Sequence, residues 1–198
     1  MYKVGLTGGI GSGKSIICRI FSLLGVAVFH SDMEARRIMD YDTAIRTKLT
    51  ELFGLEIYPD GILDRQKLAA LIFSDQRKLK AVNSIVHPAV FQAFEAWLQE
   101  MEGEPYIIKE AAIIFESGAH RNLDYIVAVT APVELRLKRV TDRNGVEERN
   151  VLERMKNQMS EEELVSRSHF VIVNDGSQLV VPQVLDLHSK FLEMANDN

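Results

Sequence analysis

The sequence has few of the features that mark secreted, membrane or nucleic-acid-binding proteins. It contains one cysteine in 198 residues, which excludes a disulfide within the chain. No apolar run reaches the roughly 20 residues that a bilayer-spanning helix needs. The N-terminus carries no basic stretch followed by an apolar segment and a cleavage site, so we expect a cytoplasmic protein. A formal net charge of −5 argues against a protein that wraps nucleic acid.

What is present is an ordinary globular composition. Hydrophobic residues make up 46% of the chain and charged residues 26%. A chain of this length fits one domain and can bury about 70% of the surface that its unfolded state exposes. The single cysteine, Cys18, lies among apolar residues, so we expect it to behave as a small buried hydrophobe.

A glycine-rich stretch near the N-terminus is the most informative part of the chain. It follows the apolar run Val4 to Leu6, precedes helically spaced apolar residues, and has the pattern G-x-x-x-x-G-K-S from Gly8 to Ser15. Glycines allow backbone N–H groups to approach phosphate oxygens that side chains would block. The stretch therefore predicts a phosphate loop, with these candidate nucleotide-binding residues: Gly9, Ile10, Gly11, Ser12, Gly13, Lys14, Ser15 and Ile16.

Two side chains of this loop have expected roles. The helix that begins near Gly13 directs unbonded N–H groups and the positive end of its dipole at an anion. Lys14 would reach the β- and γ-phosphates, and the Ser15 hydroxyl would ligate Mg²⁺. The alternative is a glycine-rich turn in which Lys14 is a solvated surface residue.

Five short apolar runs predict strands separated by helical patterns. Nearly continuous apolar strands that alternate with helices indicate an α/β fold with a five-stranded parallel sheet, covered by helices on both faces and joined by right-handed crossovers. Ligands of such sheets bind outside the carboxyl ends of the strands. The predicted strands are Tyr2 to Thr7, Val26 to His30, Tyr106 to Ile114, Tyr125 to Thr130 and Phe170 to Asn174.

Asp32 follows the second predicted strand and directly precedes a helical pattern. This order places its carboxylate at the ligand-binding edge, near the phosphate loop, where it is a candidate general base. An N-cap role, in which the carboxylate accepts a backbone N–H, would also account for an aspartate here.

The stretch from residue 33 to 104 is too long for a single crossover. Its apolar spacing predicts four helices, punctuated by Gly54, Pro59 to Gly61, the N-cap Asp64 and His87-Pro88. We interpret it as an acceptor-binding insert, about residues 42–102, within a single domain of residues 1–198. Arg65 and His87 could contact an anionic substrate, or could be a surface arginine and a histidine packed at a helix start.

Further candidates follow the third and fourth strands. Glu116, at the binding edge, could orient the acceptor or a Mg²⁺-bound water, or pair with an arginine. The basic residues after the fourth strand predict either a solvated helical face or a helical lid, about residues 138–165. In a lid, Arg139, Arg143 and Arg154 would neutralise charge on the transferring phosphoryl group.

The last strand ends at Asn174-Asp175-Gly176. Asn174 could hydrogen-bond the edge of adenine or belong to a structural turn. Ser160 to Glu163 has the pattern of a capping box that starts a short helix, to which we assign no chemistry.

The sequence resembles the dephospho-coenzyme A kinase family over nearly the whole chain. The resemblance rests on an ordered set: Val4 to Ser15, Ser31-Asp32, Asp60 to Arg65, His87-Pro88, Phe115-Glu116, Arg139 with Arg143, Arg154 with Gln158, and Asn174 to Gly176. It implies ATP-dependent phosphorylation of the ribose 3′-hydroxyl of dephospho-coenzyme A. It also implies Asp32 as the base, with Arg65, His87 and Glu116 near the acceptor.

Two positions depart from the family pattern. Ile16 stands where a second hydroxyl residue is common, which could weaken contact with the α-phosphate. Ala111-Ala112 stands in a stretch that usually contains Pro-Leu-Leu, which could alter the entry to the acceptor site.

Rival functions share parts of this pattern. A nucleoside-monophosphate kinase or another small-metabolite kinase would have the same loop, insert and lid. A GTP-dependent switch would need an Asn/Thr-Lys-x-Asp motif, which the sequence lacks. The expected partners are a small-molecule acceptor, ATP and Mg²⁺, with no nucleic acid or membrane partner, in a monomer or weak homo-oligomer.

Overall fold

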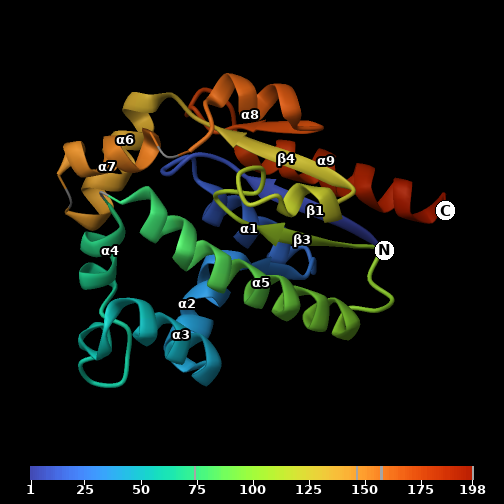
Figure 1. Ribbon diagram of the computed structural model, residues 1–198. Coiled ribbons are helices and arrows are strands. Elements are labelled where there is room, and N and C mark those ends of the chain that lie inside the picture. The colour runs from blue at the N-terminus through green and yellow to red at the C-terminus, as the bar shows by residue number, and fades with distance from the viewer. Residues whose placement is uncertain (74, 146, 157, 198) are drawn as a thin grey trace. The chain divides into compact units, whose positions relative to one another are not determined.

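The computed structural model describes residues 1–73, 75–145, 147–156 and 158–197 (Figure 1). The chain forms two compact units. The first consists of Met1–His30 together with Met101–Asn198, and the second of Ser31–Glu100. The second unit therefore starts earlier in the chain than the insert expected from residue 42.

The first unit contains a parallel five-stranded sheet with the strand order β2-β3-β1-β4-β5. In the central register, Val4 of β1 lies opposite Ile108 of β3 and Tyr125 of β4. All five predicted strands are present, although β3 ends four residues before the predicted end at Ile114. The strands are β1 (Tyr2–Thr7), β2 (Val28–His30), β3 (Tyr106–Glu110), β4 (Tyr125–Thr130) and β5 (Phe170–Val173).

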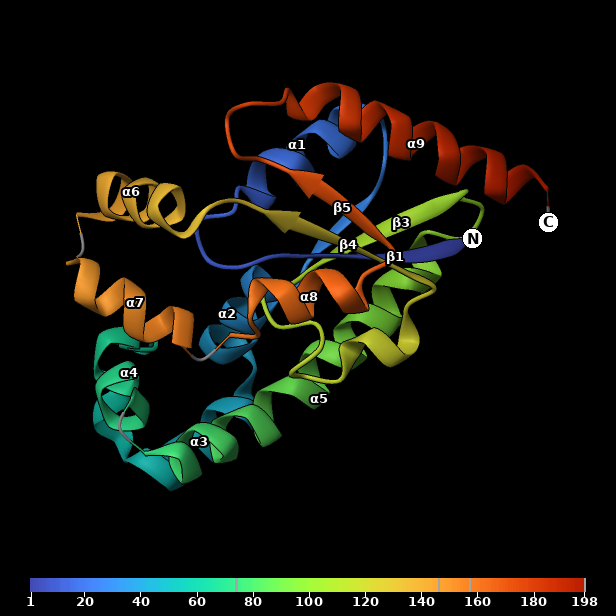
Figure 2. The same ribbon diagram turned by 90° about the horizontal axis from the view of Figure 1, so that it is seen from above.

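Helices cover both faces of this sheet, as the apolar strands predict (Figure 2). Residues alternate between faces along a strand. Val127 and Val129 of β4 belong to one core with α1 (Lys14–Leu23) and α9 (Val180–Asn196). Ile126 and Ala128 belong to a second core with Leu164 of α8 (Glu161–Arg167). The α/β fold class is therefore confirmed.

Two helices, α6 (Val133–Asn144) and α7 (Glu148–Lys156), lie between β4 and α8 in the sequence. A short 3₁₀ helix, η2 (Ala119–Asn122), precedes β4. The N-cap of α8 is Ser160, whose hydroxyl accepts a 3.2 Å hydrogen bond from Glu163 N, as the capping-box pattern predicts.

The second unit is helical. It contains α2 (Ser31–Tyr41), α3 (Thr43–Phe53), the 3₁₀ helix η1 (Leu55–Ile57), α4 (Arg65–Phe73) and α5 (Gln76–Glu100). Aspartates begin two of these helices. Asp42 Oδ1 accepts from Ile45 N, and Asp64 Oδ1 accepts from Lys67 N, both at 3.0 Å, so the predicted N-cap at Asp64 is confirmed.

The prediction of four helices in the insert is wrong at His87-Pro88, because α5 continues through Pro88. Val82, Val86, Val90 and Phe94 are all buried and recur every four residues, so one apolar stripe runs past the proline. Each such burial contributes ~1.5–3 kcal/mol, which together exceeds the ~3 kcal/mol cost of an interior proline. Neither α5 nor any other described helix has both the length and the apolar character needed to cross a membrane.

Candidate active site around the phosphate loop

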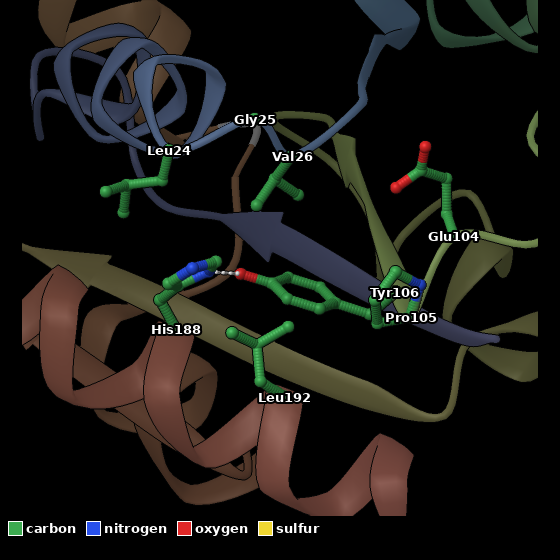
Figure 3. A pocket seen from close by; sticks show the side chains of 8 residues that line it. All are labelled: Leu24, Gly25, Val26, Glu104, Pro105, Tyr106, His188 and Leu192. Atoms are coloured by element: carbon green, nitrogen blue, oxygen red, sulfur yellow. Dashed lines mark hydrogen bonds between the residues drawn. The ribbon is translucent and has the colours of Figure 1, made fainter.

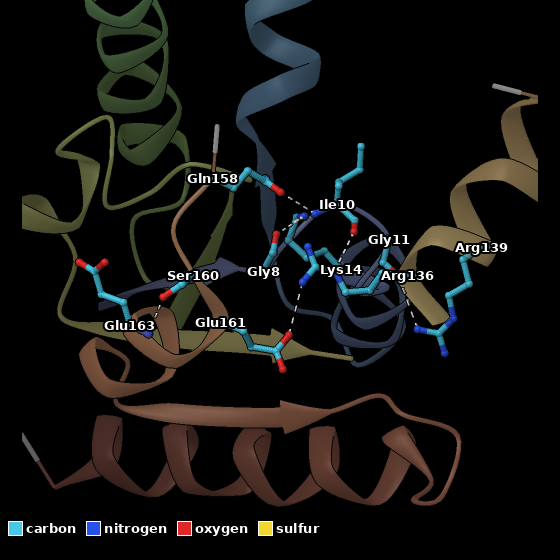
Figure 4. A network of polar contacts seen from close by, with 10 residues as sticks. All are labelled: Gly8, Ile10, Gly11, Lys14, Arg136, Arg139, Gln158, Ser160, Glu161 and Glu163. Carbon is cyan, nitrogen blue, oxygen red and sulfur yellow. Dashed lines mark hydrogen bonds and ion pairs between the residues drawn. The ribbon is translucent and has the colours of Figure 1, made fainter. Parts of the chain in front are cut away.

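The loop between β1 and α1 has the geometry of a phosphate loop (Figure 4). Gly11 and Gly13 have φ values of 81° and 99°, which residues other than glycine rarely adopt. Ser12 N donates to Gly9 O at 3.0 Å, which closes a turn within the loop. The Lys14 ammonium donates to Gly8 O at 2.8 Å and therefore lies folded back along the loop.

The glycines are needed for packing as well as for ligand approach. A Cβ at Gly9 would overlap the guanidinium of Arg136, and a Cβ at Gly13 would overlap the side-chain amide of Asn174. A Cβ at Gly11 would lie 2.5 Å from the backbone oxygen of Arg136. The loop is thus backed by protein groups from distant parts of the chain.

Ser12 supports an anion at this loop. Ser12 is 1% exposed, and its hydroxyl has no hydrogen-bond partner within the described residues. A buried polar group without a partner carries a free-energy penalty that a ligand oxygen can remove. Ser15 and Ile16, in the first turn of α1, are exposed instead.

Asn174 and Arg139 hold the loop from the side of β5 and α6. Asn174 Nδ2 donates to Ser12 O at 2.7 Å. Arg139 is half-buried and donates to Asn174 Oδ1 at 3.3 Å and to Gly11 O at 3.5 Å. The structure thus brings two of the predicted residues to the loop, and Asn174 binds the loop through its side chain.

Sequence reasoning assigned no role at the loop to three residues that the structure places at or beside it. Arg136 Nε donates to Ile10 O at 3.0 Å, and its Nη1 pairs with Glu161 Oε2 at 3.4 Å. Gln158 Oε1 accepts from Ile10 N at 2.8 Å, and its Nε2 donates to Ala112 O at 3.4 Å. The available signal was spacing, since Arg136 precedes Arg139 by three residues and so shares its helix face.

Glu110 is the last residue of β3, and Glu116 follows that strand by six residues. Glu110 Oε2 lies 3.3 Å from His30 Nδ1, which joins the ends of β3 and β2. The exposed Glu116 accepts a 2.9 Å hydrogen bond from Met159 N. Arg143 lies exposed in the last turn of α6, and Arg154 lies exposed in the last turn of α7.

The other candidates belong to the second unit. Asp32 is the second residue of α2, is exposed, and accepts no hydrogen bond from the described residues, so the capping alternative has no support. Arg65 donates to Asp40 Oδ2 at 2.6 Å. His87 is half-buried within α5, and burial lowers its pKa from the ordinary 6.5.

The loop residues fit a nucleotide phosphate, and Ser15 fits a metal held mainly by that phosphate. Among the residues that the structure describes, no group of three or more His, Cys, Asp or Glu side chains could hold a metal ion. Mg²⁺ commonly takes one or two protein ligands and completes its shell with phosphate oxygens and water.

A separate cavity of about 180 Å³ lies at the other end of the sheet (Figure 3). Tyr106, the first residue of β3, lines it and shares a 2.6 Å hydrogen bond with His188 Nδ1. Ligands of parallel sheets bind at the carboxyl ends of the strands, and this cavity is smaller than the ~300 Å³ typical of ligand pockets. The glycine loop is therefore the candidate active site.

A strand, a glycine loop with a lysine, and a helix, set in a parallel sheet of this order, define a phosphate-loop kinase. The family model described as dephospho-CoA kinase matches residues 2–179. The chain belongs to the dephospho-CoA kinase family.

Curated relatives agree with this assignment, and a solved structure is similar over most of the chain. A dephospho-CoA kinase from Bacteroides fragilis is 40% identical over 185 residues, covering 93% of this chain and 90% of the relative. One from Salinibacter ruber is 40% identical over 180 residues, covering 89% and 90%. The crystal structure of TT1252 from Thermus thermophilus has a TM-score of 0.83 and 34% identity, covering 96% of this chain and 97% of that one.

A shikimate kinase from Acinetobacter baumannii has a TM-score of 0.54 at 16% identity, covering 98% and 94%. At that identity the likeness concerns the fold alone.

Proposed function

We propose that this chain transfers the γ-phosphoryl group of ATP to the 3′-hydroxyl of the ribose of dephospho-coenzyme A, giving coenzyme A and ADP. Membership of the dephospho-CoA kinase family, over residues 2–179, is the observation that carries the acceptor's identity. The reaction would complete the synthesis of coenzyme A.

The loop supports the phosphoryl-transfer part of this proposal. Phosphoryl transfer depends on positioning and on neutralising charge on the phosphoryl oxygens. The loop amides and Lys14 would hold the β- and γ-phosphates, and the buried Ser12 hydroxyl, which has no partner among the described residues, could donate to a phosphate oxygen. Arg139, already bound to the loop at Gly11 O, would stabilise developing negative charge, with Arg143 and Arg154 as further cationic groups.

Asp32 is the proposed base for the acceptor hydroxyl. It follows β2 by two residues in the chain, and β2 ends at the carboxyl edge of the sheet, where ligands bind. Its carboxylate accepts no bond from the described residues, so it is available to accept a proton. Arg65, His87 and Glu116 are proposed acceptor-binding residues, and Asn174 a nucleotide-binding residue.

The proposed metal site uses Ser15. Mg²⁺ bound there would neutralise charge on the β- and γ-phosphates. We also propose that the enzyme acts in the cytoplasm as a monomer or weak homo-oligomer, without nucleic acid.

A direct assay tests the proposed function. The purified chain is incubated with ATP, Mg²⁺ and dephospho-coenzyme A, ADP formation is coupled to NADH oxidation, and phosphorus NMR locates the new phosphate. We expect ADP release that depends on the acceptor, and a monoester on the ribose 3′-oxygen. Equal or faster turnover with nucleoside monophosphates or shikimate would instead support another small-metabolite kinase, and a preference for GTP without any acceptor would support a switch.

A further inference from the structure

We infer that Arg136, supported by Glu161, is a positioning residue that holds Ile10 of the phosphate loop in the conformation that receives the nucleotide. The inference rests on the proposed function and adds to it a residue outside the loop motif. Arg136 acts through Ile10, and it is not proposed to touch the reacting atoms.

Side chains from outside the loop bind both backbone polar groups of Ile10 (Figure 4). Its carbonyl oxygen accepts from Arg136 Nε at 3.0 Å, and its N–H donates to Gln158 Oε1 at 2.8 Å. In most loops, backbone N–H and C=O groups form hydrogen bonds to neighbouring backbone or to water. Here α6 holds the Ile10 carbonyl group and the segment after α7 holds the Ile10 N–H group. Together they fix the backbone orientation at this loop residue.

Arg136 is built into the loop rather than resting on its surface. The residue is 7% exposed. Its guanidinium occupies the space that a Cβ at Gly9 would need, and its backbone lies where a Cβ at Gly11 would be. The loop glycines and Arg136 are therefore complementary in shape, and a smaller side chain at position 136 would leave a gap beneath the loop.

Electrostatics explain the presence of Glu161. A buried guanidinium loses hydration, and burial lowers the pKa of Arg136, whereas the Glu161 carboxylate opposes that change. The two groups are 3.4 Å apart, and the Glu161 side chain is 40% exposed. The carboxylate therefore compensates part of the hydration that the guanidinium loses and holds its Nη1 side, while remaining partly hydrated itself.

The test compares Arg136→Met, Arg136→Lys and Glu161→Gln with a matched control, Lys138→Met. Lys138 is exposed on the same helix, so its replacement removes the same charge without removing a loop contact. Three quantities are measured for each variant: the Kd for a non-hydrolysable ATP analogue, the Kd for dephospho-coenzyme A, and hydrogen exchange at the Ile10 amide by NMR. Melting temperatures confirm that each variant is folded.

We expect Arg136→Met to raise the nucleotide Kd about tenfold, the value for one lost charged hydrogen bond, and to speed exchange at Ile10. The Kd for dephospho-coenzyme A should stay within about twofold, since the proposed function assigns the loop amides to ATP and not to the acceptor. Arg136→Lys should recover part of the loss, Glu161→Gln should change the same quantities in the same direction by less, and Lys138→Met should match the wild type.

The inference is overturned if a folded Arg136→Met keeps the wild-type nucleotide Kd and Ile10 exchange, or if both ligands lose affinity equally. If Arg136→Met does not fold, Glu161→Gln decides by the same two readouts. All of these measurements proceed without turnover. A wild-type chain that binds nucleotide but phosphorylates no dephospho-coenzyme A would therefore refute the proposed function and leave the loop test intact.

Discussion

Asn174 and Ser12 are 162 residues apart in the sequence and are joined by a 2.7 Å hydrogen bond from the Asn174 side-chain amide to the Ser12 backbone oxygen. The same side chain accepts a hydrogen bond from Arg139 at 3.3 Å. The end of the last strand thus helps to fix the shape of the first loop, which connects nucleotide affinity to a residue far from the loop motif.

Replacing Asn174 with Ala should weaken binding of both ATP and inorganic tripolyphosphate by about 5-fold to about 100-fold, because an unsatisfied Ser12 carbonyl costs ~1–3 kcal/mol. Calorimetric titration with each ligand measures this. If Asn174 acted only on the adenine edge, ATP would lose affinity and tripolyphosphate would not.

Replacing Lys14 with Ala should lower kcat by about 10²–10³, since it removes a preorganised charge at the phosphates. Steady-state kinetics at saturating ATP measures the change, with the melting temperature as the folding control. Lys138→Met removes a charge elsewhere in the first unit and should leave kcat unchanged. Wild-type turnover in Lys14→Ala would contradict the proposed loop chemistry.

Replacing Asp32 with Asn should retain ATP affinity and lower the rate of transfer by about 10²–10⁴, the range for a general base. Single-turnover kinetics separates the transfer step from ATP binding. Glu51→Gln, an exposed change on α3, is the matched control for lost negative charge in the second unit. Unaltered transfer in Asp32→Asn would show that another group accepts the proton.

His87 should make the protein less stable as the pH falls below its ordinary pKa of 6.5. Burial lowers its pKa in the folded state, so the unfolded state binds more protons in the window just below 6.5. The free energy of unfolding should therefore fall from neutral pH into that window, and by less in His87→Gln. Urea titrations of both proteins at pH 7.5 and 5.5 give the free energy of unfolding at each pH. If that free energy falls equally in the wild type and in His87→Gln, the effect is excluded.

The Cys18 thiol should be unreactive in the native protein. Burial raises its pKa to about 12, and the thiolate is the reactive form. At pH 8 a disulfide reagent should release almost no product from the folded chain and one equivalent in urea, since the chain has one cysteine. Rapid labelling of the folded chain would show that the packing around α1 opens readily.

The sequence alone predicted the features that depend on local order along the chain. The phosphate loop, the five strands and the helices on both faces follow from glycine spacing and apolar runs, because these patterns act over a few residues. The caps at Asp64 and Ser160 follow from the same short-range rules.

Local rules failed where distant packing prevailed. A proline after His87 predicts a break, yet the buried stripe of α5 extends through it. Glu161 was assigned only to a capping-box pattern, yet it pairs with Arg136. A pattern of residue types indicates the structure that one segment prefers by itself. It does not indicate which distant residues that segment contacts in the folded protein.

The sequence by itself determined the candidate chemical groups and their order along the chain. These are a phosphate loop with its lysine and serine, an aspartate after the second strand, and the order of motifs of a kinase family. Only the tertiary structure decided which residues hold that loop, because Arg136, Gln158 and Asn174 reach Ile10 and Ser12 across more than a hundred residues. Such contacts depend on how strands and helices pack, and sequence spacing cannot specify them.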